Sequence, residues 1–378
     1  MPLALMLGGG GAHGAYQAGV LRGIARRRPD VHFEILTGIS AGAVNVIHFA
    51  AHEGPFASAT EWMAGLWAGL TPDQVFDVRG LPLMKNMFRW GARLASGGIG
   101  TGAEPMRGMV DTQPLRRFLT HSLVPDADGT IAGIARNIGR GTLGAVALTA
   151  TSYGTHRSMT WVQGRDLQLW QRPSRRSSAV KLTVEHVMAS SALPMLFPAI
   201  RIGDEWYGDG GIRLTSPLSP ALHLGATHVI TISTRYSRTT AEAASPQVAG
   251  YPPPAQVLGS LYNAVFLDMI DEDVTRMRMI NRLLDAVPDG RWDGMRKVEI
   301  MVIRPSQDLG LLARDYEARL PAFVKYLLRG LGTKDTTSPD LLSLVLFQRD
   351  YLERLIAIGE ADGEAHAEQV AQFVHTVN

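Results

Sequence analysis

Three short motifs in this 378-residue chain carry residue types that can do chemistry together. A glycine cluster spans residues 8–14, Ser40 stands between Gly38 and Gly42, and Asp209 precedes two further glycines far downstream. A serine hydroxyl becomes a nucleophile only with a base within hydrogen-bond reach and with donors aimed at the developing oxyanion. A carboxylate and glycine N–H groups can supply both, so the set predicts acyl transfer from an ester.

The serine motif lies where a strand is expected to turn into a helix. An apolar strand is predicted over residues 31–37 and a helix over 41–52, with Ser40 between them. This placement is typical of a nucleophile elbow, whose flanking glycines permit a sharp turn. The N–H of Ala41 can donate to an oxyanion, and the positive end of the helix dipole lies at the same point.

The glycine cluster allows two interpretations. Gly9, Gly11 and Gly14 match the spacing of a dinucleotide fingerprint, and Glu34 follows about 20 residues later. A ribose-binding acid belongs at the end of the second strand, however, whereas Glu34 is expected in its middle. We favour a backbone nest in which the N–H groups of Gly9, Gly10 and Gly11 bind an oxyanion. Four successive glycines carry an entropy cost, which indicates that something approaches this backbone closely.

The acidic motif follows an expected hairpin over residues 199–207. Asp-Gly is also a very common hairpin turn, which is the plainer interpretation of Asp209. The aromatic strand before it and the glycines after it, Gly210 and Gly211, favour a rigid and partly buried carboxylate. Such a carboxylate could take the proton of Ser40 directly, as the base of a dyad.

Histidines offer two competing sites. His223 or His228 could complete a triad with the serine and the aspartate, in the order nucleophile, acid, histidine. His48 and His52 have the i, i+4 spacing of two metal ligands on one helix face. That pair has neither a neighbouring glutamate nor an evident third ligand, so we expect packed or solvated histidines and no metal site.

Composition limits the classes of function. The chain is 46% hydrophobic and 19% charged, and its net charge of +2 gives no support for a nucleic-acid partner. It has no cysteine, which excludes disulfides, thiolate catalysis and cysteine-based metal sites. No apolar run is long enough to span a membrane, and residues 1–7 predict a buried strand rather than a signal peptide. We therefore expect a soluble cytoplasmic protein.

Strand and helix patterns alternate along much of the chain, which favours an α/β fold with a largely parallel sheet. Strands are predicted over residues 3–7, 31–37, 145–151, 156–162, 227–233 and 298–303. Helices are predicted over residues 15–28, 41–52, 184–191 and 256–286, and only helices follow residue 305.

Four segments divide the predicted architecture. We expect a catalytic domain over 1–305, a helical insertion or lid over 56–135, a linker-like loop over 237–254, and a helical C-terminal extension over 306–378. The tryptophans and methionines of the insertion fit either ordinary core or an acyl-chain channel.

Two basic clusters could contact a lipid surface. The first fits a basic amphipathic helix within the insertion and contains Lys85, Arg89 and Arg93. The second is better explained by a solvated loop and contains Arg172, Arg175 and Arg176. Both are compatible with peripheral membrane contact.

The motifs taken together resemble the patatin-like phospholipase family, which carries a glycine-rich loop, Gly-x-Ser-x-Gly and Asp-Gly-Gly or Asp-Gly-Ala in this order. The resemblance covers most of residues 3–235 and continues through residues 14–21, 189–194, 197–199 and 217–226. It implies hydrolysis of lipid acyl esters by a Ser–Asp dyad. On this basis Ser40 is the nucleophile, Asp209 is the base, and Gly9, Gly10 and Gly11 line the oxyanion hole.

With this resemblance, the expected fold is a three-layer α/β/α sandwich with a mixed, mainly parallel sheet. Neither a metal nor an organic cofactor is expected, and no oligomeric state is predicted. Two further functions fit the same fold: a non-catalytic lipid- or protein-binding module, or an acyltransferase using the same dyad.

The chain departs from the family pattern at one position. Family members usually carry Arg or Lys where this chain has His13. A neutral imidazole places less positive charge near the glycine loop, which weakens the case for anionic headgroups. It could also add pH dependence near neutrality.

Overall fold

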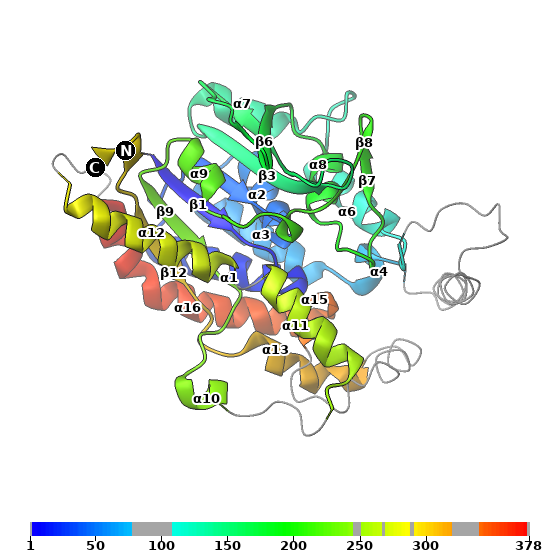
Figure 1. The fold of residues 1–378 in the computed structure, drawn as a ribbon. Helices are drawn as coiled ribbons and strands as arrows, with labels where there is room; N and C mark the ends of the chain where they lie inside the picture. The colour runs from blue at the N-terminus through cyan, green and yellow to red at the C-terminus, as the bar shows by residue number, and fades with distance from the viewer. Residues whose placement is uncertain are drawn as a thin grey trace.

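A mixed β-sheet forms the centre of the molecule (Figure 1). The computed structural model describes residues 2–77, 108–244, 251–266, 269–287, 291–319 and 340–375. In these ranges one ten-stranded sheet has the order β12-β9-β1-β2-β3-β4-β6-β5, and β8 and β7 branch from β3. Five neighbouring strands are parallel: β1 (Leu3–Leu7), β2 (Ile35–Gly38), β3 (Ala145–Ser152), β9 (His228–Ile232) and β12 (Glu299–Ile303). The sheet is therefore mainly parallel, as the sequence predicts.

Beyond β3, the sheet contains both parallel and antiparallel strand pairs. The strands there are β4 (Ser158–Gly164), β5 (Gln171–Arg172), β6 (Arg175–Ala179), β7 (Ile200–Ile202) and β8 (Glu205–Asp209). β4 and β8 both run antiparallel to β3, and β7 pairs with β8 as the expected hairpin. The expectation of a solvated loop at Arg172, Arg175 and Arg176 is wrong, because these residues lie on β5 and β6. β5 is the edge strand and β6 lies between it and β4; backbone pairing is enough to form both, so their polar side chains give no strand pattern.

Helices cover both faces of the sheet, because alternate residues of β1 enter two separate apolar cores. Leu3, Leu5 and Leu7 belong to the main core, whereas Ala4 and Met6 belong to the second one. The main core is covered by α1 (Gly14–Arg27), α2 (Ala41–Ala51), α3 (Phe56–Gly69) and α16 (Arg349–His375). The second core is covered by α9 (Ser219–His223) and α12 (Met269–Asp285). This is the expected three-layer sandwich.

Most element bounds lie within a few residues of the predicted ones, with two larger differences. The strand expected from residue 31 begins only at Ile35; Val31 and Phe33 are buried but lie outside the strand, which explains the misleading apolar pattern. The helix expected over 256–286 is two helices, α11 (Pro254–Phe266) and α12. The remaining helices of the described ranges are α4 (Pro72–Val75), α6 (Gln113–Leu123), α7 (Ala132–Arg140), α8 (Val184–Ser190), α10 (Thr240–Ala244), α13 (Leu309–Leu312) and α15 (Asp340–Val345). Short 3₁₀ turns lie at η1 (Gly11–His13), η2 (Gly210–Ile212) and η4 (Ala313–Arg319), and β10 (Arg291–Trp292) pairs with β11 (Met295–Arg296).

The C-terminal helix α16 packs along α1 at very short range (Figure 1). The contact positions are glycines four residues apart on each helix, namely Gly19, Gly23, Gly359 and Gly363. A Cβ at any of them would run into a backbone carbonyl oxygen of the opposite helix. At the same interface the Tyr16 hydroxyl donates a 3.1 Å hydrogen bond to the carboxylate of Asp362. The two helices therefore form one closely packed unit although they lie at opposite ends of the chain.

This packing predicts opposite effects for two Gly→Ala changes. Gly359→Ala should lower the free energy of unfolding by about 1–3 kcal/mol, because the added methyl forces α1 and α16 apart. Gly65→Ala is the matched control, since Gly65 lies on an exposed part of α3 with open space around it. There alanine should raise the free energy of unfolding by about 0.5–1 kcal/mol. Urea denaturation measures both, and stabilisation of both variants would contradict the packing argument.

The segment after residue 305 shares the main core with the rest of the chain. Its buried members include Leu346, Phe347, Tyr351, Leu352, Leu355 and Ile358. The proposed segment boundaries stay predictions: 1–305, 306–378, 56–135 and 237–254. The expected basic helix with Lys85, Arg89 and Arg93 lies outside the described residues. Within the described ranges, no helix has both the length and the apolar character needed to cross a bilayer.

Candidate active site

Ser40 lies at the sharp turn from β2 to α2, where the sequence places it. Its backbone has φ 56° and ψ −126°, a conformation that residues other than glycine rarely adopt. Neighbouring backbone leaves no room for a side chain at the two flanking glycines. A Cβ at Gly42 would run into the carbonyl oxygen of Leu7, and one at Gly38 would meet Gly42 itself. Tight packing around the turn thus holds Ser40 in a strained conformation.

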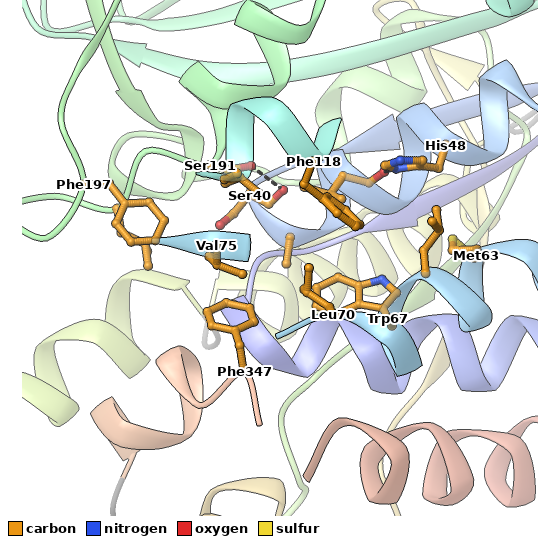
Figure 2. A pocket seen from close by; sticks show the side chains of 16 residues that line it. Ser40, His48, Met63, Trp67, Leu70, Val75, Phe118, Ser191, Phe197 and Phe347 are labelled. Carbon is orange, nitrogen blue, oxygen red and sulfur yellow. Dashed lines mark hydrogen bonds between the residues drawn. The ribbon is translucent and has the colours of Figure 1, made fainter. Parts of the chain in front are cut away.

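Two neighbouring serines hold the backbone of Ser40. The N–H of Ser40 donates a 3.2 Å hydrogen bond to the hydroxyl oxygen of Ser190, which itself donates to the carbonyl of Thr149 at 2.6 Å. The hydroxyl of Ser191 donates to the carbonyl oxygen of Ser40 at 3.0 Å (Figure 2). Sequence reasoning used this segment for the resemblance but missed its contacts, because nothing local to residues 189–194 indicates which backbone they bind.

Asp209 ends β8 and is fully buried. Its Oδ1 accepts a 2.9 Å hydrogen bond from the N–H of Gly211, and its backbone N–H donates to the carbonyl of Ala192 at 2.9 Å. The hydroxyl of Thr151 donates to its carbonyl oxygen at 2.8 Å. Gly210 lies against the backbone of β3, where a side chain would not fit. The carboxylate is therefore rigid, as predicted, and more deeply buried than predicted.

The sheet brings Ser40 and Asp209 together. β4 occupies one edge of β3, so β2 and β8 share the other edge. Gly38 at the end of β2 aligns with Leu148, and Asp209 at the end of β8 aligns with Ala150, two residues further along β3. The carboxyl ends of both strands therefore reach the same place, and Ser40 follows immediately after β2.

Burial raises the pKa of Asp209 to about 7. Hydrogen bonds from the Ser40 side chain and from the N–H of Gly211 act in the opposite direction and favour the charged form. Oδ2 of Asp209 has no partner at regular hydrogen-bond geometry within the described residues, so the contact with Ser40 is a loose one. Loose contacts of this kind are common in catalytic pairs before substrate binds.

The glycine loop presents backbone N–H groups beside Ser40. Gly10 and Gly11 have φ values of 146° and 54°, which a side chain would strain, and a Cβ at Gly11 would run into the carbonyl oxygen of Leu344. The carbonyl of Gly9 accepts a 3.1 Å hydrogen bond from Thr234. No described residue accepts a hydrogen bond from the N–H groups of these three glycines. Ala41 opens α2, so its N–H is also free of an intrahelical partner.

His13 is buried beside this loop and is not charged. Burial lowers the pKa of His13 to about 4, against the opposing effect of Asp308. Neither ring nitrogen has a hydrogen-bond partner among the described residues. The expectation that this histidine adds pH dependence near neutrality is therefore wrong, because its imidazole stays neutral from about pH 5 upward. Asp209 is the group at this site that titrates near pH 7.

His48 on α2 and His52 just after it have separate hydrogen-bond partners. The ring nitrogens of His48 contact the carbonyl of Val44 at 2.7 Å and the hydroxyl of Ser122 at 2.8 Å. Nε2 of His52 lies 2.9 Å from the hydroxyl of Ser58. The two rings are therefore engaged separately. In the ranges that the structure describes, no group of three or more possible ligands gathers around a common point.

The side chains that a triad or a dinucleotide site would need lie away from Ser40. His228 aligns with the first residue of β1, at the amino end of the strands, whereas Ser40 follows a carboxyl end. His223 stacks on Trp170 with ring centroids 4.5 Å apart. Glu34 precedes β2 instead of ending it, so it is not placed to bind a ribose. These positions support neither the triad nor the dinucleotide interpretation.

An apolar pocket adjoins Ser40 (Figure 2). It encloses about 620 Å³ when its open mouth is included. Its walls come from six regions of the chain: Gly11, Ser40, Ala41, Val44, His48, Met63, Leu66, Trp67, Leu70, Val75, Leu115, Phe118, Ser191, Leu193, Phe197 and Phe347. Residues of α3, α4 and α6 thus belong both to the main core and to the pocket wall. Sequence reasoning missed Phe347, which reaches the pocket from just before α16.

Solved structures that align with this chain include those of two larger proteins. VipD from Legionella pneumophila aligns with a TM-score of 0.38 and 15% identity, covering 80% of this chain and 61% of VipD. Human GIVD cytosolic phospholipase A2, solved with methyl gamma-linolenyl fluorophosphonate and terbium chloride, aligns with a TM-score of 0.46 and 11% identity, covering 99% and 59%. The chain spans about three fifths of the length of these structures, and alignments this loose say nothing about function. No curated protein matches the chain with significance.

A family-level match is more direct. The sequence profile described as "Patatin-like phospholipase" matches residues 5–222, which is more than half of the chain. The matched region contains the glycine loop, the serine turn and the aspartate, whose arrangement is described above. A mainly parallel sheet with helices on both faces carries all three. This chain belongs to the patatin-like phospholipase family.

Proposed function

We propose that this chain hydrolyses carboxylic ester bonds of lipids, phospholipids included, with Ser40 as nucleophile and Asp209 as base. Membership of the patatin-like phospholipase family supports a lipid hydrolase activity. The observation that carries the finer proposal is one arrangement: a strained serine beside a buried carboxylate whose pKa lies near 7, at the wall of an apolar pocket. A base with such a pKa is well matched to reaction near neutral pH.

In the first step, Asp209 takes the proton of the Ser40 hydroxyl while Oγ forms a bond to the ester carbonyl carbon. The carbonyl oxygen becomes an oxyanion, and the N–H groups of Gly9, Gly10, Gly11 and Ala41 stabilise it. The bond from the carbonyl carbon to the alcohol oxygen then breaks, and the proton passes from Asp209 to that oxygen. An acyl-serine and a free alcohol result.

In the second step, a water molecule replaces the alcohol. Asp209 takes a proton from the water while its oxygen attacks the acyl carbon, and the same N–H groups hold the second oxyanion. The bond to Ser40 Oγ breaks, and Oγ recovers its proton from Asp209. The products are a carboxylic acid and the original enzyme.

A fluorophosphonate probe tests the proposal, because it reacts covalently with an activated serine. We expect one label per chain, on Ser40, as measured by peptide mass spectrometry. Below pH 7 Asp209 is largely protonated and is no base, so the labelling rate should rise as pH increases through about 7 and level off above it. Heat-unfolded protein is the control. Labelling at another residue, or a rate independent of pH between about 5.5 and 8.5, would contradict the proposal.

A further inference from the structure

One face of α2 forms the floor of the apolar pocket. Ser40 precedes the helix, and Ala41, Val44 and His48 follow at the spacing of a single helix face. All four line the pocket, so the pocket extends along the helix away from the reactive serine. At a rise of about 1.5 Å per residue, the eight residues from Ser40 to His48 span about 12 Å.

Buried, uncharged side chains line the far end of this channel. His48 and Met63 lie together there (Figure 2), and each is almost completely buried. Because the carbonyl of Val44 can only accept, Nδ1 of His48 carries the proton, and Nε2 is left to accept from the hydroxyl of Ser122. Burial lowers the pKa of His48 to about 4, which keeps the ring neutral. Its polar atoms are therefore occupied, and the end wall suits a methyl group.

The pocket on the opposite side of Ser40 is less suited to the acyl chain of a substrate. Phe76 lies between Phe197 and Phe347, with ring centroids 6.2 and 6.1 Å away from theirs. These rings fill that side with aromatic contacts, and Figure 2 shows Phe197 and Phe347 away from His48. The direction along α2 leads away from these rings, toward His48.

We infer that this channel is the acyl site and that it selects esters of straight acyl chains of about eight to ten carbons. Carbon–carbon bonds of about 1.5 Å at tetrahedral angles advance an extended chain by about 1.25 Å each, so about 12 Å holds that number. The inference rests on the proposed function, because it requires that Ser40 receives the acyl group. A longer chain would have to displace the wall formed by His48 and Met63.

Initial rates with p-nitrophenyl esters from acetate to palmitate, kept below their micelle concentrations, test the inference. We expect kcat/KM to rise by up to about fourfold per added methylene until about eight to ten carbons, then to fall. Met63→Ala should move the optimum to chains two or three carbons longer, because about that length of side chain is removed. Val44→Phe should move it to about four carbons or fewer, because Val44 lies halfway along the floor.

Met277→Ala is the matched control, since Met277 is a buried methionine of the second core on α12. Its chain-length profile should match that of the unmodified protein. Fluorophosphonate labelling separates a failure of the acyl site from a failure of the proposed function. The acyl site alone is overturned if the protein is labelled at Ser40 and hydrolyses esters without this optimum. It is also overturned if the optimum responds to Phe347→Ala and not to Met63→Ala. Absence of labelling overturns the proposed function and the acyl site together.

Discussion

Ser40→Ala should lower kcat for ester hydrolysis by at least about 10⁴-fold, because no other group replaces the attacking oxygen. Its thermal stability should stay close to that of the unmodified chain, since alanine keeps the same strained backbone. The measurement is turnover of p-nitrophenyl octanoate together with a thermal melt. Substantial residual turnover in a folded Ser40→Ala protein would refute the assignment of this serine.

Ser40→Gly sharpens the same experiment. Glycine accepts φ 56° and ψ −126° without the penalty of a Cβ, which is of the order of 1–3 kcal/mol for other residues. This variant should therefore be as inactive as Ser40→Ala but should melt at a higher temperature. A glycine variant that is less stable than the alanine variant would show that the turn stores no strain.

Asp209→Asn should have the second largest effect, with opposite signs for activity and stability. Without the carboxylate no base accepts the proton of Ser40, and kcat should fall by about 10²–10⁴-fold. At neutral pH and above, the same change should raise the free energy of unfolding, because the folded protein no longer holds a buried charge. Turnover and urea denaturation of one preparation measure both effects.

The pH dependence of this stability difference has a definite sign. Below about pH 4 the Asp209 carboxyl is protonated in both states, so the two proteins should be about equally stable. Between about pH 4 and pH 7 the unfolded chain loses this proton while the folded chain keeps it, so the unmodified protein loses stability as pH rises. Above about pH 7 the difference should level off, at an upper limit of the order of 4 kcal/mol.

Asp204→Asn supplies the control for this measurement. Asp204 belongs to the same β7–β8 hairpin, but its side chain is fully exposed. Its substitution should leave both activity and the stability difference almost unchanged across the same pH range. An Asp209→Asn advantage that is equal at pH 5 and pH 8 would contradict the raised pKa.

Local sequence was sufficient for the motifs, because their requirements are local. Only glycine tolerates the φ values at Gly10 and Gly11, and the turn around Ser40 leaves no room for side chains at Gly38 and Gly42. Such demands appear directly in the residue types, as did the burial of β1 on both faces. The prediction of the fold class succeeded for the same reason, since continuous apolar strands and intervening helices are short-range patterns.

The predictions from sequence that were wrong or incomplete share one cause: the same residue type behaves differently in different surroundings. His13 resembles a titrating group near neutrality until its burial is known. Arg172 and its neighbours resemble a loop, because β5 and β6 are specified by the strands beside them. The two roles of residues 190–192, binding the backbone of Ser40 and that of Asp209, depend on α8 ending between two strands.

The sequence by itself determined which residues are equipped for ester chemistry and the type of sheet that carries them. Only the tertiary structure decided that Ser40 and Asp209 meet, because that depends on β2 and β8 sharing one edge of β3. It also decided the depth of the pocket and the pKa of the carboxylate. The physical reason is that burial and long-range strand pairing arise from the packing of segments distant in the chain, which no local pattern encodes.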